Sequence, residues 1–297
     1  MKNSAIQSLY RDALDYLVAS TIDDAEVTVL FVIEHVFGRP YLSLLSNDMV
    51  VSSEAYNQVF SILNGCVLGT PLAYLLGTAD FNGSSYIVDS GVLIPRPETE
   101  ELVQYSACII RWLNNQTISP VIYECGLGTG VISIELSKLF PFLSFQGWDI
   151  SSFAIENTIK NCHRHNISNL SVHHGDFFEG VSKCNDVANQ CVLVSNPPYI
   201  SDSDFDQLDE HVKREPITAL VAQEDGTAII SQLINISIKR NMILICEMGY
   251  NQRLFFQEKY PDLRLFFIQD LSGHDRFLMF FPPFFQVEDE LLNQIIQ

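Results

Sequence analysis

The feature that most constrains the fold is a glycine-rich turn between two apolar segments. Residues 121–125 are typical of a buried strand and residues 131–136 of a helix. Between them, residues 126–130 read Gly-Leu-Gly-Thr-Gly. These glycines permit positive φ angles and a close approach of the backbone to a ligand. The spacing differs from the G-x-G-x-x-G of dinucleotide-binding folds, and no Lys-Ser or Lys-Thr follows as in a P-loop.

Acidic residues stand at the ends of three successive predicted strands. Glu124 precedes the glycine turn, Asp149 ends the second strand, and Asp176 follows the third. In a βαβ nucleotide unit, an acid at the end of the second strand accepts hydrogen bonds from ribose hydroxyls. Asp176 is placed to accept from an adenine amine, and Phe177 to pack on its ring. Together with Glu124 for an amino-acid group, the set suits S-adenosylmethionine.

A second motif, Asn196-Pro197-Pro198-Tyr199, follows the apolar segment 191–195. Two prolines fix φ near about −65° and remove two backbone donors, so backbone carbonyls remain to accept hydrogen bonds. A side-chain amide precedes this stiff turn and an aromatic ring follows it. Carbonyl acceptors and a ring face suit a planar NH₂ group. The motif therefore predicts a site that holds an amide or an exocyclic amine while its nitrogen reacts.

Helical and apolar strand segments alternate from about residue 96, as expected of a parallel α/β sheet. Strands are predicted at 121–125, 143–149, 170–173, 191–195, 242–247, 264–269 and 275–281. Residues 80–95 are typical of a β-hairpin, with Asn82-Gly83 and Ser90-Gly91 as turns. Before it, apolar residues recur at helical spacing, and Gly38-Arg39-Pro40 ends the second helix. We therefore predict a helical domain at 1–72, a hairpin linker at 73–95 and a catalytic domain at 96–297.

This order of motifs resembles the class I S-adenosylmethionine-dependent methyltransferases. Within them it is similar to the HemK-type protein-(glutamine-N5) methyltransferases, which modify peptide chain release factors. The resemblance covers about residues 69 to 280, and its most specific part is Ile-Pro-Arg-Pro-Glu-Thr-Glu at 94–100. Downstream matches are Arg214-Glu215-Pro216, Asp225-Gly226, Glu247-Met248-Gly249, Gln252, Asp270-Leu271 and Arg276. The sequence departs from the family at Glu124, which is usually Asp, and at Leu127, which is usually small and polar.

The resemblance implies a Rossmann-like fold with a seven-stranded, mostly parallel sheet whose last strand is antiparallel. It implies S-adenosylmethionine binding by Glu124, Gly126, Leu127, Gly128, Thr129, Gly130, Asp149, Asp176, Phe177 and Asn196. It implies a substrate glutamine held by Arg96, Glu98, Asn196, Pro197, Pro198 and Tyr199. Among these, Asn196, Pro197 and Tyr199 are implied to be catalytic. For Arg96 and Glu98, an interdomain salt bridge is an equal alternative.

Charge separates two substrate classes. With 17 Lys and Arg against 36 Asp and Glu, the chain carries a net charge of −19, which repels duplex DNA. A basic protein partner fits an acidic surface better. The resemblance implies that this partner is a class 1 peptide chain release factor. Acidity that only reflects solubility or the source cytoplasm is an equal explanation of this charge.

The remaining composition predicts a cytoplasmic, soluble protein, and we expect a monomer although no sequence feature sets the oligomeric state. None of the seven cysteines forms a C-x-x-C pair, so neither a metal site nor a disulfide framework is indicated. No signal peptide and no apolar run of about 20 residues is found. Two other functions stay open: amino-methylation of nucleic acid, and a non-catalytic S-adenosylmethionine-binding scaffold. The helical domain either binds the partner or only stabilises the chain.

Overall fold

The computed structural model describes residues 5–45, 49–184, 191–283 and 285. The chain divides into two compact units. One comprises residues up to Thr78 together with Asp209–Arg214, and the other comprises Ala79–Leu208 and the residues from Glu215 onward. Residues 1–4 of the predicted helical domain and 286–297 of the predicted catalytic domain lie outside the described residues.

The first unit is helical, as its apolar spacing predicts. It is built from α1 (Ala5–Ala19), α2 (Ala25–Phe37), α3 (Tyr41–Leu45), α4 (Ser53–Val67) and α5 (Leu72–Leu76). In α1 the buried residues Ile6, Leu9, Ala13 and Leu17 recur at intervals of three and four, so one helix face meets the core. Gly38, with φ of 63°, ends α2 at the predicted place. The short helix η1 (Val212–Arg214) joins this unit, because Arg214 Nη2 donates to the Leu68 carbonyl at 2.6 Å.

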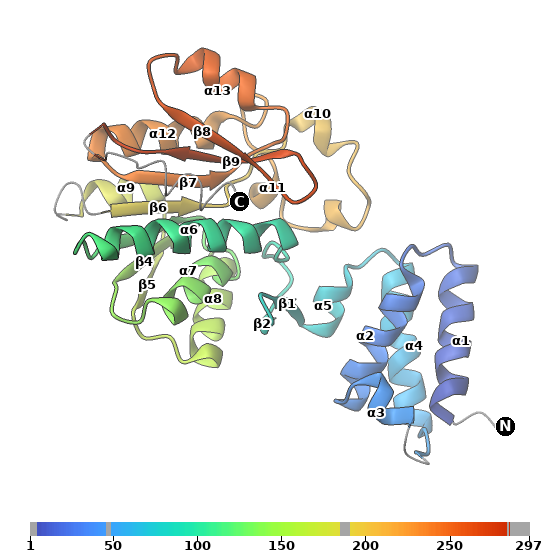
Figure 1. Cartoon of the computed structure of the whole chain (residues 1–297). Helices are drawn as coiled ribbons and strands as arrows, with labels where there is room; N and C mark the ends of the chain where they lie inside the picture. Colours follow the sequence, from blue (N-terminus) through green and yellow to red (C-terminus); the bar gives the residue numbers. More distant parts are fainter. Residues whose placement is uncertain (1–4, 46–48, 185–190, 284, 286–297) are drawn as a thin grey trace. The chain divides into compact units, whose positions relative to one another are not determined.

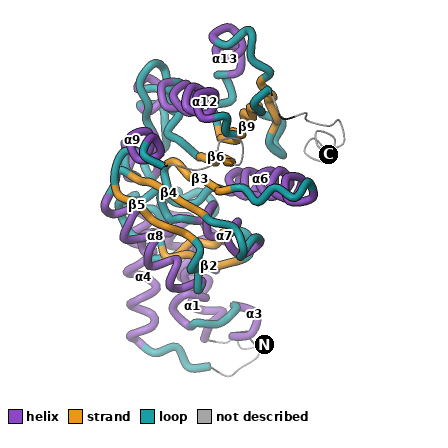
Figure 2. The backbone as a smooth tube through the Cα atoms, turned by 90° about the vertical axis from the view of Figure 1, so that its left-hand side faces the viewer, coloured by secondary structure: helices purple, strands orange, loops and turns teal. Residues whose placement is uncertain are grey.

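The second unit holds a seven-stranded sheet of described residues, in the order β5-β4-β3-β6-β7-β9-β8. Its strands are β3 (Val121–Cys125), β4 (Phe145–Asp149), β5 (Leu170–His174), β6 (Cys191–Ser195), β7 (Ile243–Glu247), β8 (Leu265–Gln269) and β9 (Asp275–Phe280). Figure 2 shows β5, β4, β3, β6 and β9 succeeding one another in this order. Only β9 runs antiparallel to its neighbours β7 and β8, as predicted for the last strand. The Rossmann-like class I methyltransferase fold is thereby confirmed.

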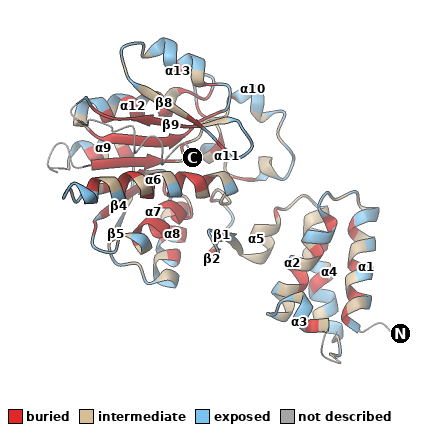
Figure 3. Ribbon diagram, in the orientation of Figure 1, coloured by how far each residue is buried: buried red, intermediate tan, exposed pale blue. Residues whose placement is uncertain are grey.

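Both faces of the sheet are covered, and successive strand residues divide between two cores. In β6, Val192 and Val194 belong to one core, whereas Leu193 belongs to the other. The first core is completed by α6 (Pro97–Asn115), α7 (Val131–Leu139) and α8 (Ser152–His165). The second is completed by α9 (Phe177–Ser182), α12 (Ala228–Arg240) and α13 (Arg253–Lys259). The central strands are therefore continuously apolar, and Figure 3 shows them buried. Two short helices, α10 (Asp202–Phe205) and α11 (Ile217–Leu220), follow β6 (Figure 1).

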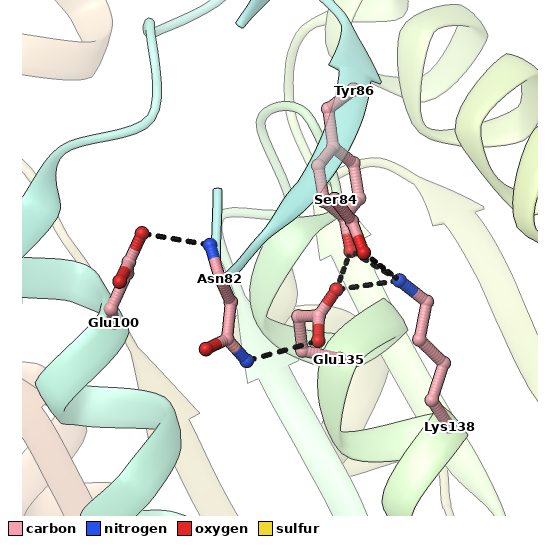
Figure 4. Close-up of polar contacts among 6 residues, drawn as sticks. All are labelled: Asn82, Ser84, Tyr86, Glu100, Glu135 and Lys138. Atoms are coloured by element: carbon pink, nitrogen blue, oxygen red, sulfur yellow. Dashed lines mark hydrogen bonds and ion pairs between the residues drawn. The ribbon is translucent and has the colours of Figure 1, made fainter. Parts of the chain in front are cut away.

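The predicted hairpin is present as β1 (Thr78–Phe81) and β2 (Ser84–Ile87), joined at Asn82-Gly83 with positive φ at both residues. Polar contacts hold it against α6 and α7 (Figure 4). The Asn82 N–H donates to Glu100 Oε1 of α6 at 2.7 Å in an exposed position, and the contacts to Glu135 of α7 are more buried. The Glu135 carboxylate accepts from Lys138 Nζ at 2.6 Å, from Asn82 Nδ2 at 3.1 Å and from the Tyr86 hydroxyl. Because these partners satisfy a nearly buried carboxylate, the hairpin is fixed to the second unit. The segment 88–96 after it is not a strand.

In the described part of the chain, no helix combines the length and the apolar character needed to cross a bilayer. Nor do the described residues include a group of three or more His, Cys, Asp or Glu side chains able to hold a metal ion.

Candidate active site

The glycine turn connects β3 to α7 and is tied to the end of β4. The Gly126 N–H donates to the Trp148 carbonyl at 2.9 Å. Gly130 precedes α7 with φ of 81°, and a Cβ there would lie 2.8 Å from Thr158 Cγ2. Only glycine satisfies both the backbone angle and the close contact at this position. The turn therefore presents bare backbone toward the carboxyl ends of the strands, where open α/β sheets bind ligands.

A cavity of about 200 Å³ lies beside this turn. Six of the predicted cofactor residues line it: Gly126, Gly128, Asp149, Asp176, Phe177 and Asn196. A smaller cavity of about 40 Å³ is lined by Leu127 and Thr129 and shares Gly126, Gly128 and Asn196 with the first. Neither Glu124 nor Gly130 lines either cavity. The sequence thus located the main cavity, but not every predicted residue faces it.

Asp149 organises the wall of the larger cavity. Its Oδ2 accepts from the Gly128 N–H at 2.9 Å, and its Oδ1 accepts from the Ser151 N–H at 2.8 Å. Burial raises the pKa of Asp149, while these backbone donors act in the opposite direction. Each carboxylate oxygen has a second lone pair, which leaves acceptor capacity for ribose hydroxyls. Asp149 therefore fixes the turn and faces the cavity at the same time.

The far end of the cavity combines an acid with aromatic rings. Asp176 caps α9 through an Oδ1 that accepts from the Glu179 N–H at 2.9 Å. Phe177 is buried and packs edge-on against Trp148, and both rings line the cavity. Phe178, which the sequence analysis did not single out, lines it as well. An apolar slot with one carboxylate at its edge matches an adenine ring with its exocyclic amine.

Glu124 lies beneath the turn rather than in the cavity. It is 1% exposed, and its Oε2 accepts from the Ser133 N–H in the first turn of α7 at 3.0 Å. Leu127 also points inward: a Cβ on Gly147 would lie 2.3 Å from Leu127 Cδ2. The glycine in β4 thus accommodates the apolar residue that departs from the family pattern. Leu127 is therefore accommodated within the fold, whereas the buried Oε1 of Glu124 has no hydrogen-bond partner among the described residues.

Glu124 makes a testable contribution to stability. Burial raises its pKa from 4.5 to about 8, so the folded state binds this proton more tightly than the unfolded state. The free energy of unfolding should therefore fall as the pH rises from about 4.5 to about 8, by an amount on the order of a few kcal/mol. Glu124→Gln cannot titrate and keeps an oxygen for the Ser133 N–H, so its stability should fall less over this range.

The measurement is urea unfolding followed by tryptophan fluorescence at pH 5 and pH 9. Both tryptophans, Trp112 and Trp148, lie in the second unit, so the signal reports on that unit alone. Glu247 also titrates near pH 7 but is present in both proteins, so its contribution cancels from the comparison. An equal loss of stability in the wild type and the variant would contradict the assignment to Glu124.

The turn after β6 places Asn196 between the two cavities, since Asn196 lines both. Pro198 lines the larger one. Pro197 is buried, and neither it nor Tyr199 lines either of these two cavities. Burial raises the pKa of the Tyr199 hydroxyl, which lies near Glu247 and beside the Arg276 guanidinium. The structure therefore brings Asn196 to both cavities and places the Tyr199 hydroxyl among charged side chains.

Hydrogen bonds and close contacts from other segments hold this turn in place. The Tyr199 carbonyl accepts from Gln252 Nε2 at 2.9 Å, and Gln252 Oε1 accepts from the Gly249 N–H at 2.9 Å. A Cβ on Gly226, which has φ of 81°, would lie 2.1 Å from the Tyr199 carbonyl oxygen, so no other residue fits there. On the other side of the turn, the Ser195 hydroxyl donates to the Cys125 carbonyl at 2.6 Å. Gly226, Gly249 and Gln252, which the sequence analysis gave only as family matches, therefore support this turn.

Arg96 and Glu98 take different positions. Arg96 lines the smaller cavity, and its Nη2 lies 2.5 Å from Glu215 Oε1. Both residues belong to the second unit, so this ion pair is not an interdomain one. Glu98 lines neither of these two cavities.

Several cavity residues were not predicted as site residues. They are Gly91, Val92, Leu93, Cys125, Trp148, Ile150, Ser151, Ala154, Gly175, Phe178, Pro216, Thr218, Ala219 and Ile229. Ile150 and Ser151 directly follow Asp149, so their place at a strand end was a usable signal. Gly91 to Leu93 come from the chain after the hairpin, and Pro216 to Ala219 come from α11 and the residue before it. The sequence marked Ser90-Gly91 as a turn and Pro216 as part of a family match, but neither pattern placed its segment at the cavity.

The site matches known proteins in sequence and in fold. Residues 100–223 match the family model described as Methyltransferase small domain. A release factor glutamine methyltransferase of Enterococcus faecalis is 35% identical over 242 residues, which cover 78% of this chain and 83% of that protein. Its counterpart in Aliivibrio fischeri is 30% identical over 285 residues, covering 92% and 95%. A bifunctional methyltransferase of Rickettsia bellii is 29% identical over 306 residues, and they cover 92% of this chain but only 54% of that protein.

Among solved structures, the hMettl16 catalytic domain in complex with MAT2A 3'UTR hairpin 6 superposes with a TM-score of 0.53. The match covers 77% of this chain and 83% of that chain at 15% identity, so it supports the fold alone. The sequence relatives carry the assignment further, because several are 30% to 35% identical over most of their own length. The chain belongs to the release factor glutamine methyltransferase family.

Proposed function

We propose that the protein transfers a methyl group from S-adenosylmethionine to the side-chain amide nitrogen of a glutamine. The substrate would be the glutamine of the Gly-Gly-Gln motif in class 1 peptide chain release factors. The observation that carries the proposal is the position of Asn196, which lines both the cofactor cavity and the cavity beside it. An amide-binding turn at that junction fits a reaction at an amide nitrogen.

The residues around the larger cavity fit S-adenosylmethionine. The turn at 126–130 would hold its amino-acid group, Asp149 its ribose hydroxyls, and Asp176 with Phe177 its adenine. Glu124 would act on the cofactor through the turn, because its carboxylate holds the start of α7. When bound, S-adenosylmethionine supplies an electrophilic methyl group on a sulfonium.

A glutamine nitrogen is a weak nucleophile, because its lone pair is delocalised into the carbonyl group. Catalysis should therefore depend on position and electrostatics rather than on a strong base. The Asn196 side-chain oxygen and the Pro197 carbonyl would accept the two amide hydrogens and raise the electron density on nitrogen. Tyr199 would pack against the amide plane. The surplus proton on nitrogen would leave to water.

The substrate side of the site would involve Arg96 and Pro198. Arg96 lines the smaller cavity while paired with Glu215, so a substrate backbone that approaches there meets a guanidinium already held in place. Glu98 would contribute charge near the site rather than a direct contact. The net charge of −19 would attract a basic factor. The helical unit is the candidate partner-binding module, and such a substrate would place the protein in the cytoplasm.

Amino-methylation of nucleic acid is the second candidate, since an amide-binding turn of this kind also suits an exocyclic base amine. The hMettl16 complex shares the fold at 15% identity. The charge of −19 opposes it, because nucleic-acid binding depends on neutralising phosphates.

The proposal is tested with radiolabelled S-adenosylmethionine and three substrates in parallel. These are an unmodified release factor with a Gly-Gly-Gln loop, the same factor with that glutamine changed to alanine, and duplex DNA. We expect label in the first factor alone. Label in DNA alone would favour the second candidate, and no label in any substrate would favour a cofactor-binding scaffold.

A further inference from the structure

Thr99, in the first turn of α6, contacts Asn196, the residue proposed to bind the substrate amide. Asn196 Nδ2 donates to Thr99 Oγ1 at 3.0 Å, across 97 positions of the sequence. Thr99 is 3% exposed and lines the smaller cavity together with Asn196. Its hydroxyl is therefore shielded from bulk water and needs partners within the protein.

Glu247, the last residue of β7, lies close to this hydroxyl. Its carboxylate is 1% exposed, its Oε1 has no hydrogen-bond partner among the described residues, and the Thr99 side chain is near enough to lower its pKa. Burial raises the pKa of Glu247 to about 7, while Thr99 and the Arg276 and Arg96 guanidinium groups act in the opposite direction. Above that pH the group is a carboxylate, which can only accept hydrogen bonds.

Hydrogen-bond chemistry fixes the direction of each contact that these three residues can make. Because a carboxylate only accepts, the Thr99 hydroxyl can pair with Glu247 only by giving it its single proton. Thr99 Oγ1 is then left with lone pairs, so it can only accept from Asn196. The Asn196 nitrogen must face Thr99, and its oxygen is the atom presented to a ligand.

We propose that Thr99 and Glu247 are positioning residues that hold the Asn196 carboxamide with its oxygen toward the substrate amide. This inference rests on the proposed function, in which that oxygen accepts a hydrogen of the glutamine NH₂ group. A carboxamide turned the other way would present its own NH₂ group to the substrate NH₂ group, and two donors would oppose each other. We call the Glu247–Thr99–Asn196 chain the relay. Because it orients the group that meets the substrate, it should affect the reactivity of the bound substrate more than the binding of the cofactor.

The test compares Thr99→Val with Thr99→Ser at pH 8.5, with a Gly-Gly-Gln release factor as substrate. Valine keeps the shape of threonine but removes the hydroxyl, so Asn196 loses its fixed orientation. We expect kcat to fall by about 10- to 100-fold, as for the loss of a buried hydrogen-bond partner. The KM for the factor and the Kd for S-adenosylmethionine should change less than about three-fold. Thr99→Ser, which keeps the hydroxyl, should restore most of kcat.

Ser106 on the same helix supplies a matched control. Its hydroxyl is buried and has no hydrogen-bond partner among the described residues. Ser106→Ala should therefore leave kcat unchanged, which shows that removing a buried hydroxyl from α6 is not in itself harmful.

Glu247→Gln tests the relay without the risk of an unpaired buried charge. A glutamine amide can donate to Thr99, which lets Thr99 donate in turn to Asn196 and reverse the carboxamide. We expect a fall in kcat of about ten-fold in a variant whose urea midpoint at pH 8.5 is no lower than that of the wild type. The double variant with Thr99→Val should lose no more than the single Thr99→Val variant, because both changes break one relay.

Wild-type methylation together with an unchanged kcat in Thr99→Val or Glu247→Gln would overturn the relay while leaving the proposed function intact. Equal losses in Thr99→Val and Thr99→Ser would also overturn it. Absence of methylation by the wild-type protein itself would instead overturn the proposed function, and the relay with it.

Discussion

Replacing Asn196 with alanine is expected to lower kcat for glutamine methylation by about 10²- to 10³-fold, the cost of removing one group that stabilises charge in a transition state. In the proposed function the side-chain oxygen is one of the two acceptors that hold the substrate amide, and alanine supplies no replacement. Asn196 also lines the cofactor cavity, so the affinity for S-adenosylmethionine should fall, but by no more than about ten-fold.

The measurement combines single-turnover methylation of a release factor with calorimetric titration of S-adenosylmethionine. Asn235→Ala is the matched control: Asn235 is on α12, accepts from the Tyr260 hydroxyl and lines neither cavity. A kcat of Asn196→Ala within ten-fold of the wild type, with the fold intact, would contradict the assigned role.

The second large effect is expected at the cofactor. In Asp149→Asn one of the two side-chain oxygens becomes an NH₂ group, while the Gly128 and Ser151 N–H groups still point at both positions. The new NH₂ group must then face the N–H of either Gly128 or Ser151, so one of the two hydrogen bonds that Asp149 accepts is lost. Because a charged acceptor for the ribose hydroxyls is lost as well, we expect the Kd for S-adenosylmethionine to rise by about 100-fold or more.

Asp176→Asn provides the comparison within the same cavity. Asparagine is as good a helix cap as aspartate, so α9 should be preserved and the Kd should rise by only about ten-fold. Trp148 lines the cavity, so its fluorescence can report on binding in both variants. Equal losses of affinity at the two positions would show that Asp149 has no special role in the turn.

The sequence predicted the fold because its signals are local. Each central strand is an apolar run that can be read without its neighbours, and Asn82-Gly83 and Gly38 end their elements where the structure ends them. The same is true of the main cavity: Gly126, Asp149 and Asp176 follow strands, and the ends of parallel strands meet at one edge of the sheet.

What the sequence did not show depends on contacts between distant segments. The relay joins Thr99, Asn196 and Glu247 from α6, the turn after β6 and the end of β7, and no local spacing relates them. Glu124 was predicted to face the cofactor from its residue type and position. Which way its side chain turns is decided by the α7 N–H group that it accepts from, and this becomes visible only in three dimensions.

The boundary between the predicted linker and the catalytic domain illustrates the same limit. Composition separates the hairpin from the segments on either side of it, whereas the structure groups it with the second unit from Ala79 onward. The reason is the Glu135 carboxylate, which gathers donors from the hairpin and from α7. The segment 209–214 likewise groups with the helical unit, through the contact between Arg214 and Leu68.

The most direct test of glutamine methylation is tandem mass spectrometry of the Gly-Gly-Gln peptide. A release factor made in cells without such an enzyme is incubated with this protein and S-adenosylmethionine, then digested. The proposed function predicts one added methyl group, with fragment ions that place it on the glutamine side chain. An unmodified glutamine, or a methyl group on another residue of the factor, would contradict the assignment of the Asn196-Pro197-Pro198-Tyr199 turn to a glutamine amide.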